Sequence, residues 1–280
     1  MKIIHSPECL SYSQLGHPES PERIQGIYDT IKDKHEFVTP RTAAESDILA
    51  THSTDLVETV RSGQFFDADT PAHANIFELA RLSAGTALEA AELALSGCAA
   101  FSLMRPPGHH ADKSRPGGFC YFNNIAIAVT HALKSVDKVA ILDFDCHHGN
   151  GTQDIFLGDS RVLYVSLHES PLYPGTGLVS DRNCCNYPLP PGTDEKLFLP
   201  SFIQALDEIK SFAPKLLAVS AGFDSHRADP LTGMLLETET FGEIGRLIGG
   251  LGIPFFSVLE GGYSSELGAS VDCYLDGIDM

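Results

Sequence analysis

The sequence predicts a single α/β domain in which a mostly parallel sheet is flanked by helices on both faces. Two observations support this fold class. The apolar runs typical of strands lack polar alternation, as expected for strands buried on both faces of a parallel sheet. Helical stretches separate these runs, which is the order of βαβ units. The 280 residues contain no repeat, low-complexity tract or Gly/Ser linker, so we expect one domain over residues 1–280.

The predicted elements alternate along the chain. Short runs rich in Val, Ile, Leu and Phe are predicted to be strands at 99–104, 139–144, 162–167, 216–220 and 254–259. Longer stretches with helical character are predicted to be helices at 76–96, 124–134, 197–212 and 238–249.

Each predicted strand runs directly into polar or glycine residues. The segments that follow the strands are 105–110, 145–151, 168–169, 221–226 and 260–263. In open α/β sheets, ligands bind outside the carboxyl ends of the strands. Loops from several parallel strands therefore deliver these side chains to one crevice, which is the predicted functional site.

The densest chemical signal is the segment 143–148, which reads DFDCHH. Alternate side chains of a strand share a face, so Asp143, Asp145 and His147 can point the same way. Carboxylate and imidazole groups suit zinc, and a catalytic zinc needs three protein ligands beside an open position. Asp224, after another strand, is the best third ligand. A single buried Asp is more often a hydrogen-bond partner, but several converging charged groups are costly to bury without a metal.

The chain is strongly acidic, with 19 basic and 37 acidic residues and a formal charge of −18. An acidic field repels phosphate backbones, so we expect no nucleic-acid partner. The same field would attract a cationic ligand such as a polyamine or a lysine-rich segment. Solubility alone would explain the charge equally well.

Composition also disfavours membrane-spanning and secreted proteins, a disulfide framework and a four-cysteine zinc site. No apolar run approaches the roughly 18 residues that span a bilayer, and the first residues lack the apolar stretch of a secretory signal. We therefore expect no membrane partner and a cytoplasmic location. The seven cysteines are scattered without a C-x-x-C pair, which argues against a disulfide framework and a four-cysteine zinc site.

Several long motifs give the chain a resemblance to the histone deacetylase superfamily, which includes acetylpolyamine amidohydrolases and acetoin-utilisation proteins. In chain order they are HPESPER (17–23), RPPGHHA (105–111), GFCYFNN (118–124), DFDCHHGNGTQ (143–153), YPGTG (173–177), GFD (222–224) and EGGY (260–263). Their detail is closer to the class II branch and its bacterial relatives than to class I. The resemblance implies the arginase/deacetylase fold.

The resemblance also implies a ligand set. Asp145, His147 and Asp224 match the zinc ligands of the family, whereas Asp143 matches the aspartate that orients the first histidine of a tandem pair. Arginase relatives hold two manganese ions with a larger carboxylate set. The smaller set here supports one catalytic metal.

Amide hydrolysis needs an activated water, a general base, a proton for the departing amine and a donor for the oxyanion. Zinc polarises the carbonyl and lowers the pKa of bound water to about 7. The adjacent His109 and His110 are the candidate base and acid. The resemblance makes His110 the main one, oriented by Asn150, where some relatives carry Asp. Tyr263, after two glycines, is the predicted oxyanion donor.

A substrate tunnel is the next implication. The resemblance places two aromatic walls around an aliphatic chain, and the residues assigned to the tunnel are Phe119, Tyr173, Gly118, Leu231, Gly261 and, at the rim, Asp69. A potassium ion is also implied, with several ligands acting through main-chain carbonyls: Asp143, Asp145, His147, Ser166 and Leu167. The alternative for this last set is an ordinary hydrogen-bonded strand end.

One segment departs from the family pattern. Relatives carry a longer glycine-rich stretch after the motif at 173–177, but here only 178–187 intervenes, and it contains Cys184 and Cys185. We expect this shortened loop to border the site entrance, where it would open the tunnel mouth or change the preferred chain length.

We therefore predict a zinc-dependent deacetylase acting on an N-acyl amide of lysine or a polyamine, as a small molecule or a peptide. Two alternatives stay open. One is a catalytically degenerate member that binds acylated ligands, and the other is a two-manganese ureohydrolase. The sequence leaves the substrate, the acyl-chain preference and the existence of a homo-oligomer undecided.

Overall fold

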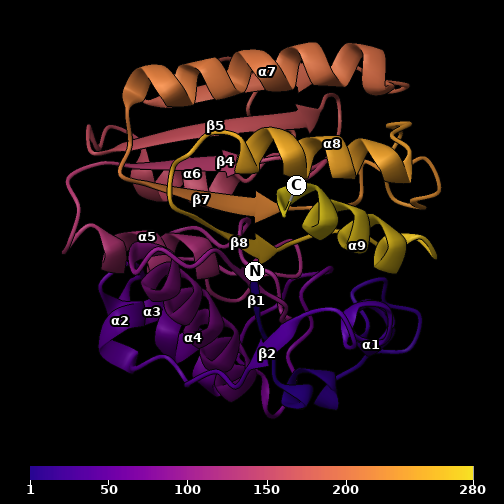
Figure 1. Cartoon of the computed structure of the whole chain (residues 1–280). Coiled ribbons are helices and arrows are strands. Elements are labelled where there is room, and N and C mark those ends of the chain that lie inside the picture. Colours follow the sequence, from indigo (N-terminus) through magenta and orange to yellow (C-terminus); the bar gives the residue numbers. More distant parts are fainter. Residues whose placement is uncertain (280) are drawn as a thin grey trace.

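An eight-stranded sheet forms the centre of the computed structural model, which describes residues 1–279 (Figure 1). Its strands are β1 (Lys2–Ile4), β2 (Glu36–Val38), β3 (Ala100–Ser102), β4 (Val139–Asp143), β5 (Val162–Glu169), β6 (Cys184–Leu189), β7 (Leu216–Ala221) and β8 (Phe255–Leu259). They follow the order β2-β1-β3-β8-β7-β4-β5-β6, and every neighbouring pair is parallel. The predicted parallel sheet is confirmed.

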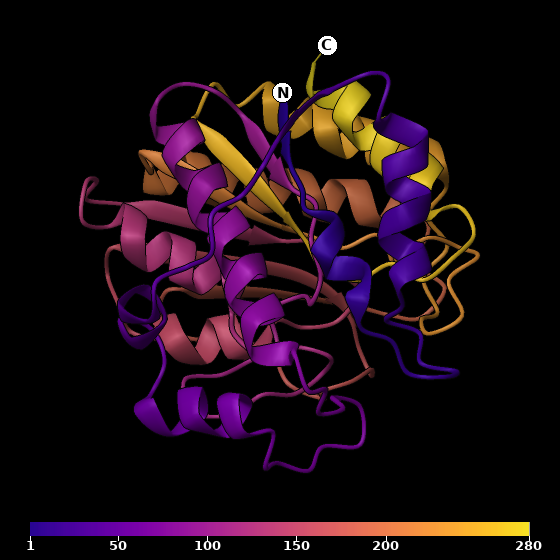
Figure 2. The ribbon, with the colours of Figure 1, turned by 90° about the horizontal axis from the view of Figure 1, so that it is seen from below.

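Helices cover both faces of this sheet, as predicted (Figure 2). Their bounds are α1 (Pro21–Ile31), α2 (Glu45–Leu49), α3 (Thr54–Ser62), α4 (Ile76–Leu95), α5 (Asn124–Ala132), α6 (Asn150–Phe156), α7 (Glu195–Phe212), α8 (Thr238–Gly249) and α9 (Leu267–Ile278). One hydrophobic core packs α1, α7, α8 and α9 on one face. A second packs α4, α5 and α6 on the other. Within residues 1–279, no helix has the length and apolar character needed to cross a lipid bilayer.

Burial on both faces explains the missing polar alternation of the strands. Every side chain of β4 is buried. Ala140 and Leu142 belong to the core with α7 and α8, whereas Val139 and Ile141 belong to the core with α4 and α5. A strand with no solvent-facing side has no polar side, so its sequence is a continuous apolar run.

The strand order brings the polar segments together. β8 and β7 come late in the chain but lie between β3 and β4. Because the four strands are parallel, their carboxyl ends meet at one edge of the sheet. The segments 103–110, 260–263, 222–226 and 144–149 follow these ends, so the crevice where ligands bind in such sheets lies among them.

Several elements differ from the prediction. The short strands β1, β2 and β6 and the helices α1, α2, α3, α6 and α9 were not predicted. Segment 168–169 belongs to β5 rather than following it. The interpretation of 178–187 as a loop is wrong for its last four residues, because Cys184 begins β6 and pairs with Tyr164 of β5. Only 178–183 remains a loop.

A buried ion-pair network holds the N-terminal segment against the loop after β3. The Arg105 side chain is fully buried, and its Nε and Nη2 atoms each lie 2.7 Å from a carboxylate oxygen of Glu19. Burial alone would raise the pKa of Glu19, but its hydrogen bonds and charge contacts with Arg105 hold that pKa below its usual range. A buried ion pair is tolerated when its hydrogen bonds are satisfied, and Arg105 also donates to the carbonyls of Cys9 and Tyr12 at 2.8 Å.

Candidate metal and catalytic site

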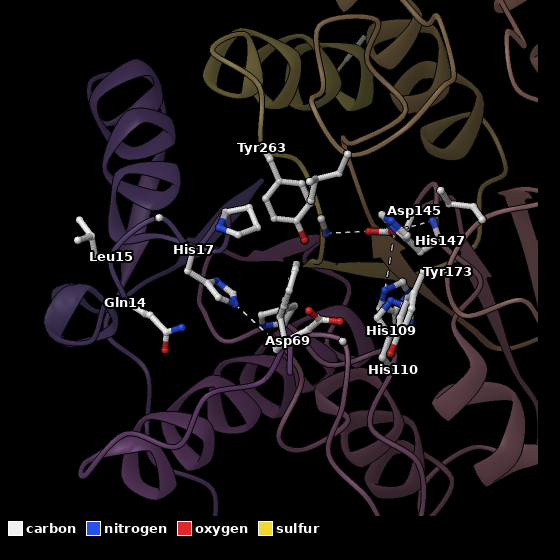
Figure 3. Close-up of a pocket in the computed structure, with 18 residues that line it drawn as sticks. Gln14, Leu15, His17, Asp69, His109, His110, Asp145, His147, Tyr173 and Tyr263 are labelled. Carbon is white, nitrogen blue, oxygen red and sulfur yellow. Dashed lines mark hydrogen bonds and ion pairs between the residues drawn. The ribbon is translucent and has the colours of Figure 1, made fainter. Parts of the chain in front are cut away.

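The three predicted zinc ligands lie together at the carboxyl edge of the sheet. Figure 3 shows two of them, Asp145 and His147, at the cavity described below. Asp145 and His147 come from the loop after β4, and Asp224 comes from the loop after β7. Their ligand atoms all lie within 4.8 Å of one another. His147 Nδ1 lies 2.8 Å from Asp224 Oδ2 and 3.1 Å from Asp145 Oδ1. Two carboxylates and one imidazole form a donor set that suits zinc, so the residues fit this metal.

The electrostatics of this cluster favour a cation. Asp145 and Asp224 are both fully buried. Burial and the negative charge of Asp145 raise the pKa of Asp224 to about 7. Burial opposes protonation of His147, but Asp224 and Asp145 raise its pKa well above the usual value. A divalent cation between the two carboxylates would relieve their mutual repulsion.

Backbone amides fix the orientation of both carboxylates. Gly261 N donates to Asp145 Oδ2 at 2.7 Å, and Cys146 N donates to Asp224 Oδ1 at 2.7 Å. In each carboxylate the other oxygen is the one that faces His147. A Cβ atom at position 261 would overlap the carboxylates of Asp145 and Asp224. Only glycine therefore lets this backbone approach the metal cluster.

The histidine pair lies beside the cluster, and each imidazole has its own partner. His109 Nδ1 lies 3.1 Å from Asp143 Oδ2, which also accepts the Tyr164 hydroxyl at 3.0 Å. Asp143 thus stands behind His109, outside the group of possible metal ligands. His110 Nδ1 lies 2.8 Å from Asn150 Oδ1. An amide oxygen only accepts, so His110 Nδ1 carries the proton and its Nε2 has a free lone pair.

The pKa values of the two histidines are shifted in opposite directions. Burial alone would lower the pKa of His109, but the charges of Asp145, Asp143 and Glu260 raise it to about 10. Burial and the neighbouring charges of His109 and His147 lower the pKa of His110 well below its usual value. Their ring centroids are 4.0 Å apart. A pair of groups whose pKa values are pushed apart suits different acid and base roles.

A cavity of about 380 Å³ leads to these groups (Figure 3). The rings of Phe119 and Tyr263 pack edge to face with their centroids 5.8 Å apart, and the rings of Tyr173 and His110 do the same at 5.0 Å between centroids. All the predicted tunnel residues line the cavity: Asp69, Gly118, Phe119, Tyr173, Leu231 and Gly261. Seven further residues line the cavity but were not predicted as tunnel residues: Gln14, Leu15, Gly16, His17, Pro18, Pro107 and Leu172. Of these, His17, Pro18 and Pro107 lie in the motifs at 17–23 and 105–111, whereas the other four carry no signal in the sequence.

Tyr263 is fixed at the cavity by two residues that the sequence did not single out. Asp229 Oδ2 accepts the Tyr263 N–H at 2.7 Å, and the Arg23 guanidinium lies 4.6 Å from the centroid of the Tyr263 ring. Arg23 lies in the motif at 17–23, so a signal existed, whereas Asp229 lies outside every motif. Burial raises the pKa of Tyr263 well above its usual value, so its hydroxyl keeps its proton at neutral pH.

The residues predicted to hold potassium lie at the end of β4, in the loop that follows it and within the neighbouring strand β5. Asp143, the last residue of β4, pairs in register with Ser166 of β5. The Ser166 hydroxyl is 2.9 Å from His168 Nδ1, and Leu167 is buried. The ion itself stays a prediction.

Comparisons with known proteins find relatives of this chain. A family model described as "Histone deacetylase domain" matches residues 17–276. A probable deacetylase of Methanothermobacter thermautotrophicus is 42% identical, over 100% of this chain and 91% of that protein. An acetylpolyamine amidohydrolase of Burkholderia pseudomallei is 41% identical, over 71% of this chain and 62% of that protein. The crystal structure of an acetylpolyamine aminohydrolase from Burkholderia pseudomallei superposes with a TM-score of 0.93 at 31% identity, over 99% of this chain and 98% of that one.

Proposed function

The chain belongs to the histone deacetylase family, and from this premise we propose that it is a zinc-dependent hydrolase that removes acetyl or other acyl groups from lysine side chains or polyamines. The relatives support deacetylation in general terms. The main observation in favour of zinc-dependent hydrolysis is that the cluster of Asp145, His147 and Asp224 lies beside the histidine pair at the same cavity. The proposal treats residues 1–280 as one deacetylase domain.

Asp145, His147 and Asp224 are the residues that would hold zinc. A zinc ion bound there supplies Lewis acidity, which polarises the amide carbonyl and lowers the pKa of a bound water to about 7. The orientation of both carboxylates by backbone amides supports this assignment, because such outer partners fix metal ligands before the metal arrives.

The protein's own groups then move the protons. His110 Nε2 takes a proton from the attacking water, because Nδ1 of the same ring is occupied by Asn150. The same nitrogen returns a proton to the departing amine. His109, held in its charged form by Asp145 and Asp143, would place a positive charge near the developing oxyanion. The Tyr263 hydroxyl donates a hydrogen bond to that oxyanion.

The cavity walls suit a linear aliphatic amide. Phe119 and Tyr173 line the cavity, so their rings would offer apolar surface to a chain of methylene groups. Asp69 lies at the mouth, where its carboxylate suits a backbone amide or a distant ammonium group of the substrate. We propose in addition that a potassium ion is bound by Asp143, Asp145, His147, Ser166 and Leu167.

A substrate screen tests this function. The zinc-loaded protein is incubated with N-acetylputrescine, acetylspermidine and acyl-lysine peptides of increasing acyl length, and the released carboxylate and free amine are quantified. We expect equal amounts of the two products from at least one class. Binding of acylated ligands without release of product by any of them would instead favour the catalytically degenerate alternative.

The variant Asn150→Asp is expected to make the enzyme more sensitive to acid. It places a negative charge about where the amide oxygen now lies, 2.8 Å from His110 Nδ1. A negative neighbour stabilises the imidazolium and raises the pKa of His110 by about one unit or more. The base must be neutral to act, so the acidic limb of the kcat/KM profile should move to higher pH. Asn75→Asp, an exposed change of the same charge, is the control, and an unmoved limb would contradict the role of Asn150.

Asp69→Asn is expected to weaken the binding of cationic substrates selectively. Asp69 is exposed at the cavity mouth, and an exposed ion pair contributes about 0.2–1 kcal/mol. The KM for N-acetylputrescine should rise about two- to fivefold while kcat is unchanged. N-acetylbutylamine, which has the same chain without the second amine, provides the matched comparison. An equal rise of KM for both compounds would show that Asp69 does not recognise the charge.

A further inference from the structure

We propose that Glu260 is a positioning residue whose buried carboxylate fixes the loop of the histidine pair relative to the loop that carries Tyr263. This proposal rests on the proposed function, since it concerns the relative placement of the base and the oxyanion donor. Glu260 follows β8 directly, is fully buried and does not line the cavity. It therefore acts through other residues and does not touch the substrate.

The Glu260 carboxylate connects two segments at the edge of the sheet. Its Oε2 atom accepts the N–H groups of Gly108 at 2.7 Å and His109 at 3.2 Å. Its Oε1 atom accepts the hydroxyl of Ser220, in β7, at 3.0 Å. One side chain thereby joins the histidine loop to the end of the strand that leads to Asp224.

The histidine loop depends on this acceptor. In the described part of the chain, no backbone carbonyl accepts a loop hydrogen bond from Gly108 N or His109 N. Gly108 and His109 are both buried, and buried backbone amides are almost always paired because leaving one unpaired is costly. Without the carboxylate, the loop would have to shift to bring these two amides to water or to another acceptor.

The backbone of the same residue is tied to the Tyr263 loop. Arg23 Nη2 donates to the carbonyl of Glu260 at 2.6 Å, and Arg23 Nε donates to the carbonyl of Gly262 at 2.6 Å. The same guanidinium covers the ring of Tyr263. Glu260 thus holds the histidine loop with its side chain while its main chain is part of the Tyr263 support. Figure 3 shows Tyr263 and His110 on different sides of the cavity that these two loops border.

The hydrogen bonds of Glu260, rather than its charge, explain this role. All three side-chain partners are neutral donors: two amides and one hydroxyl. Glutamine has the same length, and its oxygen can accept both amides while its NH₂ group donates to Ser220 Oγ. Aspartate keeps the charge but is one methylene shorter, so it cannot reach both segments at once.

The variants Glu260→Gln and Glu260→Asp separate the two properties, because the first keeps the length of the side chain and the second keeps its charge. A misplacement of about 1 Å in a catalytic group can cost about 100-fold in rate. E260D should therefore lower kcat by about 100-fold. The walls at Phe119 and Tyr173 lie on other loops, so KM should stay within about twofold. E260Q removes the weakest of the three carboxylate charges that raise the pKa of His109, while Asp145 and Asp143 remain. E260Q should therefore keep kcat within about threefold of the wild type.

A stability control separates positioning from general destabilisation. Tyr274→Phe removes the buried 2.8 Å hydrogen bond between the Tyr274 hydroxyl and Ser257 of β8, and neither residue lines the cavity. Tyr274→Phe should lower the melting temperature and leave kcat and KM unchanged. The proposal is overturned if E260D keeps the wild-type kcat, or if E260Q loses as much kcat as E260D.

Amide hydrogen exchange tests the proposal without activity. The Gly108 and His109 amides should be protected in the wild type and in E260Q, and they should exchange faster in E260D. If the wild type hydrolyses no acyl amide, the proposed function fails while this measurement still decides the role of Glu260. Equal exchange in E260Q and E260D would refute it.

Discussion

Removal of the metal is expected to reduce hydrolysis to background, and stoichiometric zinc is expected to restore it. The proposed mechanism requires a Lewis acid at the cluster formed by Asp145, His147 and Asp224, because water alone is a poor nucleophile toward an amide. The metal-free cluster holds protons that zinc must displace, since the pKa of His147 is raised and that of Asp224 is about 7. Zinc affinity should therefore fall as the pH is lowered through neutrality.

Metal analysis of two variants makes this prediction specific. Asp224→Asn should lose both zinc and activity, because it removes a ligand from a three-ligand site. Asp143→Asn should keep one zinc per chain and lose activity only in part, since Asp143 contacts His109 and lies outside the cluster. Zinc should also raise the melting temperature of the wild type in a concentration-dependent way, but not that of D224N. Two manganese ions per active wild-type chain would support the ureohydrolase alternative instead.

Tyr263→Phe is expected to retain substrate binding and lose turnover by about 100- to 1,000-fold, the usual effect of removing one oxyanion donor. The donor acts on charge that develops only in the transition state, so kcat falls while KM changes little. The Phe ring can keep the contact with the Arg23 guanidinium, and the Asp229 bond to the backbone of residue 263 is unaffected. The loss should therefore come from the missing hydroxyl alone.

The matched control is Tyr173→Phe, which removes a hydroxyl from the opposite wall of the same cavity. Tyr173 is 45% exposed and contacts His110 through its ring. Its kcat should stay close to that of the wild type. Near-normal turnover of Tyr263→Phe, or equal losses in the two variants, would reject the oxyanion role.

The central strands could be predicted because their burial leaves a continuous apolar run in the sequence. The outer strands could not. β1 and β2 have three residues each and lie in no longer apolar run, unlike β3, which is equally short but lies within the run at 99–104. β6 contains Asn186 and Pro188, residues typical of loops, yet it pairs along its whole length with β5. A strand at the edge of a sheet needs pairing on one side only, so its sequence carries a weaker signal.

The chemical groups of the site could be predicted from the sequence, but the different placements of Asp143 and Asp145 could not be derived from the sequence pattern. The period-two pattern puts Asp143 on the same face as Asp145, and only the resemblance separated the two. The structure gives the physical reason: β4 ends at Asp143, and its side chain turns to His109 and Tyr164. The contacts of Arg23 with residues 260 and 262 join segments far apart in sequence, so no local pattern could predict them.

The placement of β7 and β8 between β3 and β4 has a consequence for how the protein is synthesised. When a ribosome has released only the first 200 residues, β3 and β4 have no neighbour on their inner sides. Unpaired strand edges attract other chains, so this stage is vulnerable to aggregation. The sheet can close only after residue 259 has emerged, and pairing over such sequence distances is slow. Folding should therefore finish largely after translation of β8, and fragments that end before Leu216 should depend on chaperones to stay in solution.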